Sequence, residues 1–156
     1  MLMLEEATRF CELVESDAGS SPAEFRDELI LALTELLVVA YRLPDVDPTR
    51  NEEVPAVAHG EWEQIFQHLG RRLEADLYWS VLQVVPFDPD ESDTGIGSLC
   101  DDLADIWRDL VAGLRALSGG TSADEVAWQW KYDFESHWGH HAVDALRVLH
   151  ALKYEP

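Results

Sequence analysis

The sequence predicts an all-α protein, an antiparallel up-and-down helical bundle of five to six helices. Apolar residues recur at helical spacing along most of the 156 residues, and no segment shows the convincing alternation expected of a strand. Helix-start signals precede several of the apolar runs, and turns rich in glycine, proline and serine separate them.

The first two predicted helices are separated by a short turn. The first covers residues 4–15. The second has a clear start, because Ser21 stands at the N-cap position, Pro22 at the first helical position and Glu24 three residues after the cap. This pattern is typical of a capping box, and the proline ring fixes φ at the first helical position to a value that suits a helix. The second helix should end before Pro44, which cannot continue it.

The middle of the chain is predicted to hold a long polar loop and two shorter helices. The loop covers residues 45–58, and its length in a small chain is typical of a functional or mobile segment. A third helix starts near Glu61, and Gly70 should end or bend it. A further helical stretch is expected over residues 73–84, followed by an acidic turn over residues 86–93.

The last two predicted helices are the longest. Residues 97–117 form an amphipathic helix with a narrow apolar seam. A Gly-Gly turn follows, and Ser122 then caps a helix that extends to about Leu152, with Gly139 as a weak point within it. We expect all of these helices to form a single domain over residues 1–156, which is enough chain to bury a core.

The charge balance limits the partners of the protein. The chain has 31 acidic and 11 basic residues, which gives a formal net charge of −20 at pH 7. Such a chain repels nucleic-acid phosphates and anionic membrane surfaces, and it attracts cationic partners and divalent cations. We therefore expect neither a nucleic-acid nor a membrane partner, and the candidates that remain are a protein partner and a homo-oligomer.

Two features favour a cytoplasmic location. The apolar run Met1–Leu4 is short, follows no basic residue and is followed at once by Glu5 and Glu6, so it does not resemble a signal peptide. Cys11 and Cys100 stand outside any metal-binding or redox spacing. Such cysteines are typical of buried free thiols in a reducing compartment.

Three carboxylates are predicted to share one face of the helix that carries the apolar seam. Asp102, Asp105 and Asp109 fall within an arc of about 60° that borders this seam. Asp101 is expected to point elsewhere, and Arg108 to lie on a different face where it screens little. The three carboxylates repel one another unless water, arginine or a metal ion screens them.

A histidine pair on the last helix offers complementary ligands. His137 and His141 are one turn apart, so both rings project from the same face and can chelate one metal ion. If the two longest helices pack antiparallel across the Gly-Gly turn, these rings meet the aspartates. The candidate metal ligands are then Asp102, Asp105, His137 and His141, and the candidate ions are zinc, manganese, iron and magnesium. The wider candidate binding set adds Asp109 and Trp130.

The same residues also have an ordinary structural interpretation. Helical His-x-x-x-His spacing arises often by chance, and the chain lacks both the His-Glu-x-x-His motif and the Glu-x-x-His pairs of di-iron bundles. The histidines would then border a core formed by the tryptophans. The sequence therefore favours a non-enzymatic binding or regulatory module. The alternative is a divalent-metal-binding bundle, including a metal-dependent hydrolase, and whether the chain is an enzyme stays open.

Five strings of the sequence can be compared with known families, and the two that begin at Asp101 and His137 are long enough to be specific. They are Leu77-Tyr78-Trp79, Phe87-Asp88-Pro89, Asp101–Leu114, Trp128-x-Trp130 and His137–Arg147. Together they resemble an uncharacterised bacterial family, domain of unknown function 5063, from Phe10 to His150. The positions expected to match the family pattern are Asp101, Asp102, Asp105, Arg108, Asp109, Trp130, His137, Trp138 and His141. The resemblance implies a small bacterial all-α protein and says nothing about a reaction.

Two looser resemblances concern metal chemistry. The Asp-x-x-Asp spacing resembles half of the carboxylate motif with which all-α nucleotide pyrophosphohydrolases hold magnesium, although the chain lacks the acidic partner helix. The histidine pair resembles that of the three-histidine metal-binding bundles, a resemblance that implies His59 as the third ligand.

Overall fold

The computed structural model describes residues 2–48, 52–90 and 93–155, and most of these residues are helical. In chain order the elements are α1 (Leu2–Glu15), α2 (Pro22–Ala40), α3 (His59–Leu73), β1 (Leu77–Val81), β2 (Thr94–Ser98), α4 (Leu99–Ser118), α5 (Ala123–Asp133), η1 (Phe134–Trp138) and α6 (Gly139–Tyr154). None of the helices in the described ranges is both long enough and apolar enough to cross a bilayer.

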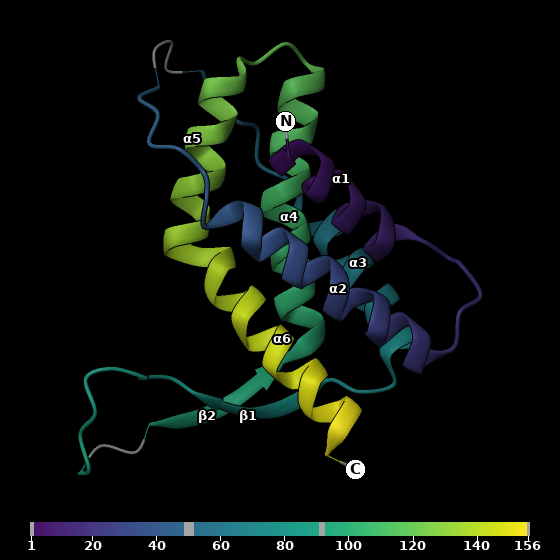
Figure 1. The fold of residues 1–156 in the computed structure, drawn as a ribbon. Helices are drawn as coiled ribbons and strands as arrows, with labels where there is room; N and C mark the ends of the chain where they lie inside the picture. The colour runs from purple at the N-terminus through teal and green to yellow at the C-terminus, as the bar shows by residue number, and fades with distance from the viewer. Residues whose placement is uncertain (1, 49–51, 91–92, 156) are drawn as a thin grey trace.

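Helix α4 is the centre of the bundle (Figure 1). It contacts α1, α3, α5 and α6, and the predicted apolar seam is buried along it. The fully buried seam residues are Leu99, Leu103, Ile106 and Leu110. Because burying one leucine or isoleucine side chain contributes about 1.5–3 kcal/mol, this seam is a main source of stability for the fold.

The start of α2 confirms the predicted capping box. The Ser21 hydroxyl accepts a hydrogen bond from the Glu24 backbone N–H, and the Glu24 carboxylate accepts one from the Ser21 backbone N–H. The helix ends at Ala40, before Pro44, as expected. The sequence predicts that Gly70 ends or bends the third helix. In the structure, α3 continues through Gly70 and ends at Leu73.

A β-hairpin corrects the all-α prediction. The segment predicted as a helix over residues 73–84 instead contains β1, which pairs antiparallel with β2. Tyr78 lies opposite Gly97, and a Cβ atom at Gly97 would lie 2.3 Å from the tyrosine ring. The apolar spacing of this segment suits a helix as well as a strand, and its pairing partner lies beyond a long loop. Local periodicity therefore could not identify it.

The last predicted helix is interrupted by one π-helical turn. The chain continues from α5 through η1 into α6, and the interruption lies next to Gly139, the expected weak point. A Cβ atom at Gly139 would lie 2.3 Å from the carbonyl oxygen of Phe134, so a larger residue conflicts with this turn. Such π turns occur frequently at functional sites, and this one contains His137.

The two cysteines are buried free thiols, as the sequence predicted. Cys11 lies in α1 and Cys100 in α4. Burial is the main cause that raises the pKa of both thiols, to about 12 for Cys100. Neither cysteine belongs to a group of potential metal ligands among the described residues.

Candidate metal centre

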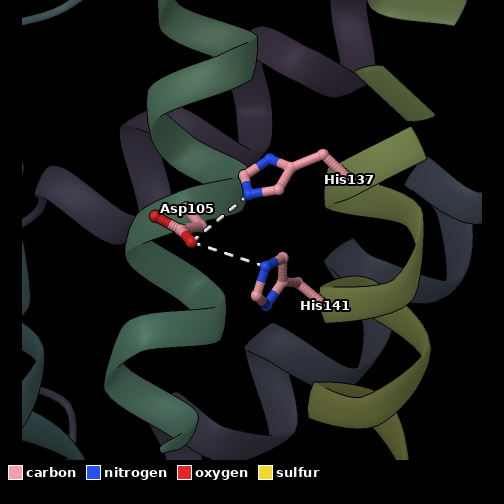
Figure 2. A group of neighbouring side chains, drawn as sticks. All are labelled: Asp105, His137 and His141. Atoms are coloured by element: carbon pink, nitrogen blue, oxygen red, sulfur yellow. Dashed lines mark ion pairs between the residues drawn. The ribbon is translucent and has the colours of Figure 1, made fainter. Parts of the chain in front are cut away.

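One aspartate and two histidines converge between α4 and the η1–α6 segment (Figure 2). Oδ2 of Asp105 lies 3.5 Å from Nε2 of His137 and 3.4 Å from Nε2 of His141. One potential ligand atom from each residue lies within 4.8 Å of the other two. Two ligand atoms bound tetrahedrally to one ion, with bonds of about 2.0–2.1 Å, lie roughly 3.4 Å apart. The spacing around Asp105 therefore suits a single ion.

Two further aspartates hold the opposite nitrogens of the histidine rings. Nδ1 of His137 donates to Oδ2 of Asp109 over 2.6 Å, and Nδ1 of His141 donates to Oδ1 of Asp102 over 2.8 Å. A carboxylate in this position fixes both the tautomer and the orientation of an imidazole, and metal-binding histidines usually have such a partner. Both rings are therefore held with Nε2 directed at Asp105.

The other oxygen of Asp105 is held from two sides. Oδ1 accepts a hydrogen bond from the Trp62 indole N–H over 2.8 Å and lies 2.9 Å from the Arg108 guanidinium. The expectation that Arg108 faces away from the aspartates was therefore wrong, because its long side chain reaches back one turn along α4. Since these two donors occupy Oδ1, Oδ2 is the oxygen that faces the histidines.

The hairpin contributes one residue to the site. The Tyr78 hydroxyl donates to Oδ2 of Asp102 over 2.7 Å, while Oδ1 of the same carboxylate accepts from His141. Asp102 is only 5% exposed and Asp105 only 8%, so these hydrogen bonds offset the cost of removing two carboxylates from water. Burial, and then the hydrogen bond to Asp102, raise the pKa of Tyr78, which therefore stays a donor.

The electrostatics of the site favour added positive charge. The hydrogen bond to Asp102 is the largest cause that raises the pKa of His141, against the opposing effect of burial. Burial is the largest cause that raises the pKa of Asp101, Asp133 and Asp144, and neighbouring carboxylates raise it further. Carboxylates with raised pKa values are stabilised by a nearby proton or cation.

The hydrogen-bond directions define what the centre can do. A neutral imidazole that donates from Nδ1 has a lone pair on Nε2. At both histidines that lone pair faces a carboxylate oxygen of Asp105, so two acceptors oppose each other. A proton on each Nε2 removes the repulsion, and so does one cation between the three atoms. The arrangement can therefore act as an imidazolium–carboxylate network or as a metal centre.

A second group of potential ligands adjoins the first. One ligand atom each from Asp101, Asp102 and His141 lies within 4.8 Å of the others. The expectation that Asp101 points away from the site was wrong, because α6 packs against α4 and His141 lies near both Asp101 and Asp102.

Two residues discussed from the sequence lie outside both groups. Trp130 is 3% exposed and packs in the core, where a Cβ atom at Gly113 would lie 2.3 Å from its Nε1. That Nε1 has no hydrogen-bond partner among the described residues. His59 stacks on the Trp62 ring with centroids 5.4 Å apart. It therefore lies beside a hydrogen-bond donor to Asp105 and is in neither ligand group.

Comparison with known proteins identifies the fold and the family. The crystal structure of protein BF1032 from Bacteroides fragilis is similar, with a TM-score of 0.83 and 23% sequence identity. The match covers 99% of this chain and 92% of that chain, and at this identity it shows a shared fold. No curated protein matches the chain. The family described as domain of unknown function (DUF5063) matches residues 2–155, so the chain belongs to this family.

Proposed function

We propose that the protein binds one divalent metal ion through Asp105, His137 and His141. The observation that supports this most is the orientation of the two imidazoles. Both present Nε2 to the same carboxylate oxygen, at distances typical of ligands that share an ion, while Nδ1 is held by a second carboxylate. In this proposal Asp102 and Asp109 orient the histidines and do not bind the ion.

The donor set favours some ions over others. Two imidazole nitrogens and one carboxylate oxygen suit zinc, iron or manganese. Magnesium prefers oxygen ligands in an octahedral arrangement and is the weakest candidate of the four considered. Two histidines and one carboxylate also form the usual ligand set of non-haem iron sites with open positions.

The number of ligands supports a chemical role for the ion. Structural zinc sites usually have four protein ligands, whereas catalytic sites have three and leave a position for water or substrate. The side chain of His137 is 39% exposed and that of His141 is 24% exposed, so solvent reaches the histidines. An ion held there would activate a bound water molecule, which makes a metal-dependent hydrolase the enzymatic form of this proposal.

Metal analysis of untagged protein tests the proposal. Purified wild type should contain about one zinc, iron or manganese ion per chain, or take up one in a calorimetric titration of the metal-free protein. Asp105→Asn and His137→Gln should each lower the affinity by at least about 100-fold, since each removes a ligand.

His140→Gln is the matched control for this experiment. His140 is exposed, precedes His141 directly and lies in neither ligand group. The variant should bind metal like wild type. Equal metal binding by wild type and Asp105→Asn, with both folded by circular dichroism, would contradict the proposal. So would a loss of affinity in His140→Gln as large as that in His137→Gln.

A binding or regulatory role, which the sequence favoured, has separate support. The hairpin exposes apolar side chains that belong to neither ligand group. A bacterial cytoplasmic location is part of the proposal as well, because a reducing compartment keeps the thiols of Cys11 and Cys100 free. Fractionation of the native cell tests the location, and recovery of the protein outside the cytoplasm would contradict it.

A further inference from the structure

Exposed apolar side chains gather on the hairpin and its connecting loop. Eight of the 18 exposed large hydrophobic residues in the described part of the chain lie between residues 77 and 96. This group, here called the hairpin patch, consists of Leu77, Trp79, Val81, Leu82, Val84, Val85, Phe87 and Ile96. Single exposed apolar residues are ordinary, whereas a group of this kind is typical of an interaction site.

By their alternation, the strands place four of these side chains on one face: Leu77, Trp79, Val81 and Ile96. Trp79 lies opposite Ile96 in the ladder, and the two are 79% and 72% exposed. Leu77 and Val81 flank Trp79 at two-residue spacing and are exposed as well, while Tyr78 turns inward to Asp102. When one face of an antiparallel sheet packs against the protein, the other face is in contact with solvent and is usually polar. The outer face of this hairpin has the composition of a buried one.

Carboxylates line the clefts beside the hairpin patch. Three clefts adjoin the hairpin, and the largest two, of about 640 and 610 Å³, lie between the hairpin and the α6 region. Arg147 is the only lysine or arginine among the described residues that line them. The lining carboxylates are Asp76, Asp88, Asp93, Glu135, Asp144 and Glu155. The surface therefore combines an apolar centre with an acidic rim.

We propose that the hairpin patch docks a basic, apolar segment of a partner protein. Leucine or aromatic side chains of that segment would cover Trp79 and Ile96, and its lysines or arginines would face the acidic rim. A second copy of the chain fits less well, because each copy carries a net charge of −20 and would present the same acidic rim. An anionic membrane surface is repelled for the same reason.

Synthetic peptides test the charge and the location of this surface together. The probe is an amphipathic helical peptide of leucine and lysine, about 18 residues long, and its counterpart has glutamate in place of lysine. Titration calorimetry with excess EDTA, at about 0.15 M salt, should show saturable binding of the lysine peptide. The glutamate peptide should not bind.

Matched variants locate the binding. The double variant Trp79→Thr, Ile96→Thr keeps residues that favour strands and should weaken binding of the lysine peptide at least about tenfold. The control Leu31→Ser, Val38→Thr removes two exposed apolar side chains from α2 and should leave binding unchanged. Equal binding by the two double variants would show that the peptide binds through general charge attraction, and would overturn the proposal.

Two further measurements separate this partner from other occupants. Sedimentation of wild type should show a monomer, and a dimer that Trp79→Thr, Ile96→Thr abolishes would assign the patch to a second copy. Binding of wild type to phosphatidylcholine–phosphatidylserine vesicles that this variant loses would assign it to a membrane. Either result overturns the proposal. Because all the tests use metal-free protein, their outcome is independent of the proposed metal centre.

Discussion

Two regions depart from the usual distribution of side chains, and they do so in opposite ways. The first is the interface between α4 and α6, and the second is the surface of the hairpin. The first buries the carboxylates of Asp102 and Asp105, while the second exposes Trp79 and Phe87. Folding alone favours the reverse in both places. The apolar core of the bundle has to offset the free-energy cost of both departures. Each is therefore better explained by a function than by the fold.

Outside the leucine core, the largest effect on stability is expected on the α4–α6 side, at the π turn. Gly139→Ala adds a Cβ atom 2.3 Å from the Phe134 carbonyl oxygen and should lower the free energy of unfolding by about 1–3 kcal/mol. Urea denaturation measures this change. The control Gly70→Ala adds a Cβ atom in open space within α3 and should raise the stability by up to about 1 kcal/mol. Equal stability of the two variants would contradict the assigned strain.

The next largest effect is expected at the hydrogen bond between Tyr78 of the hairpin and Asp102 of α4. Tyr78→Phe removes the hydroxyl that donates to the buried carboxylate of Asp102. One carboxylate oxygen then loses its donor, and the free energy of unfolding should fall by about 1–3 kcal/mol. Chemical denaturation measures the loss, with Tyr132→Phe as the control, because Tyr132 is 55% exposed. A loss equally large in both variants would show that the Asp102 contact contributes little.

A smaller effect is expected from pH, and only on the α4–α6 side. The pKa of His141 is raised in the folded protein, so its contribution to stability is fully present below its ordinary value of about 6.5. The contribution is lost as the pH rises through the raised pKa. In EDTA, the unfolding free energy of metal-free protein should therefore decrease over that interval. His141→Gln should reduce this slope, and an unchanged slope would contradict the assignment.

The smallest effect is expected at the hairpin patch. Trp79→Thr, Ile96→Thr should change the free energy of unfolding by no more than about 0.5 kcal/mol, because both side chains are exposed. In the core, Leu103→Ala should cost about 2–5 kcal/mol. Thermal and urea unfolding of the two proteins make the comparison. A hairpin variant as unstable as the core variant would mean that the patch serves the fold.

The sequence predicts most of the helices because their signals are local. The capping box at Ser21 and the seam from Leu99 to Leu110 depend only on neighbours within a few turns, and both are present in the structure. The proximity of Asp105 to the histidines also follows from helical spacing and one short turn. The role of these residues as metal ligands stays a prediction. The hairpin was missed because its pairing is non-local.

Two other features of this region could not be predicted from the sequence, each for a physical reason. Trp62 and Tyr78 reach the site from α3 and β1, and no local pattern relates either of them to α4. Trp130, which the sequence analysis gave both as a binding candidate and as a core residue, stands seven residues before His137, about two turns of a uniform helix. The π turn between them changes the angular phase of the chain. Trp130 consequently packs in the core against Gly113.

The hydrogen bond from Tyr78 to Asp102 has a consequence for the motion of the chain. Amide protons of the β1–β2 ladder exchange with solvent when the hairpin opens, and opening that moves Tyr78 breaks this bond. Any cation that fixes His141, and through it Asp102, adds to the free energy of that opening. By thermodynamic linkage, closure of the hairpin would in turn raise the affinity of the site for such a cation. Deuterium uptake at the ladder amides would thus report occupancy of a site on a different element.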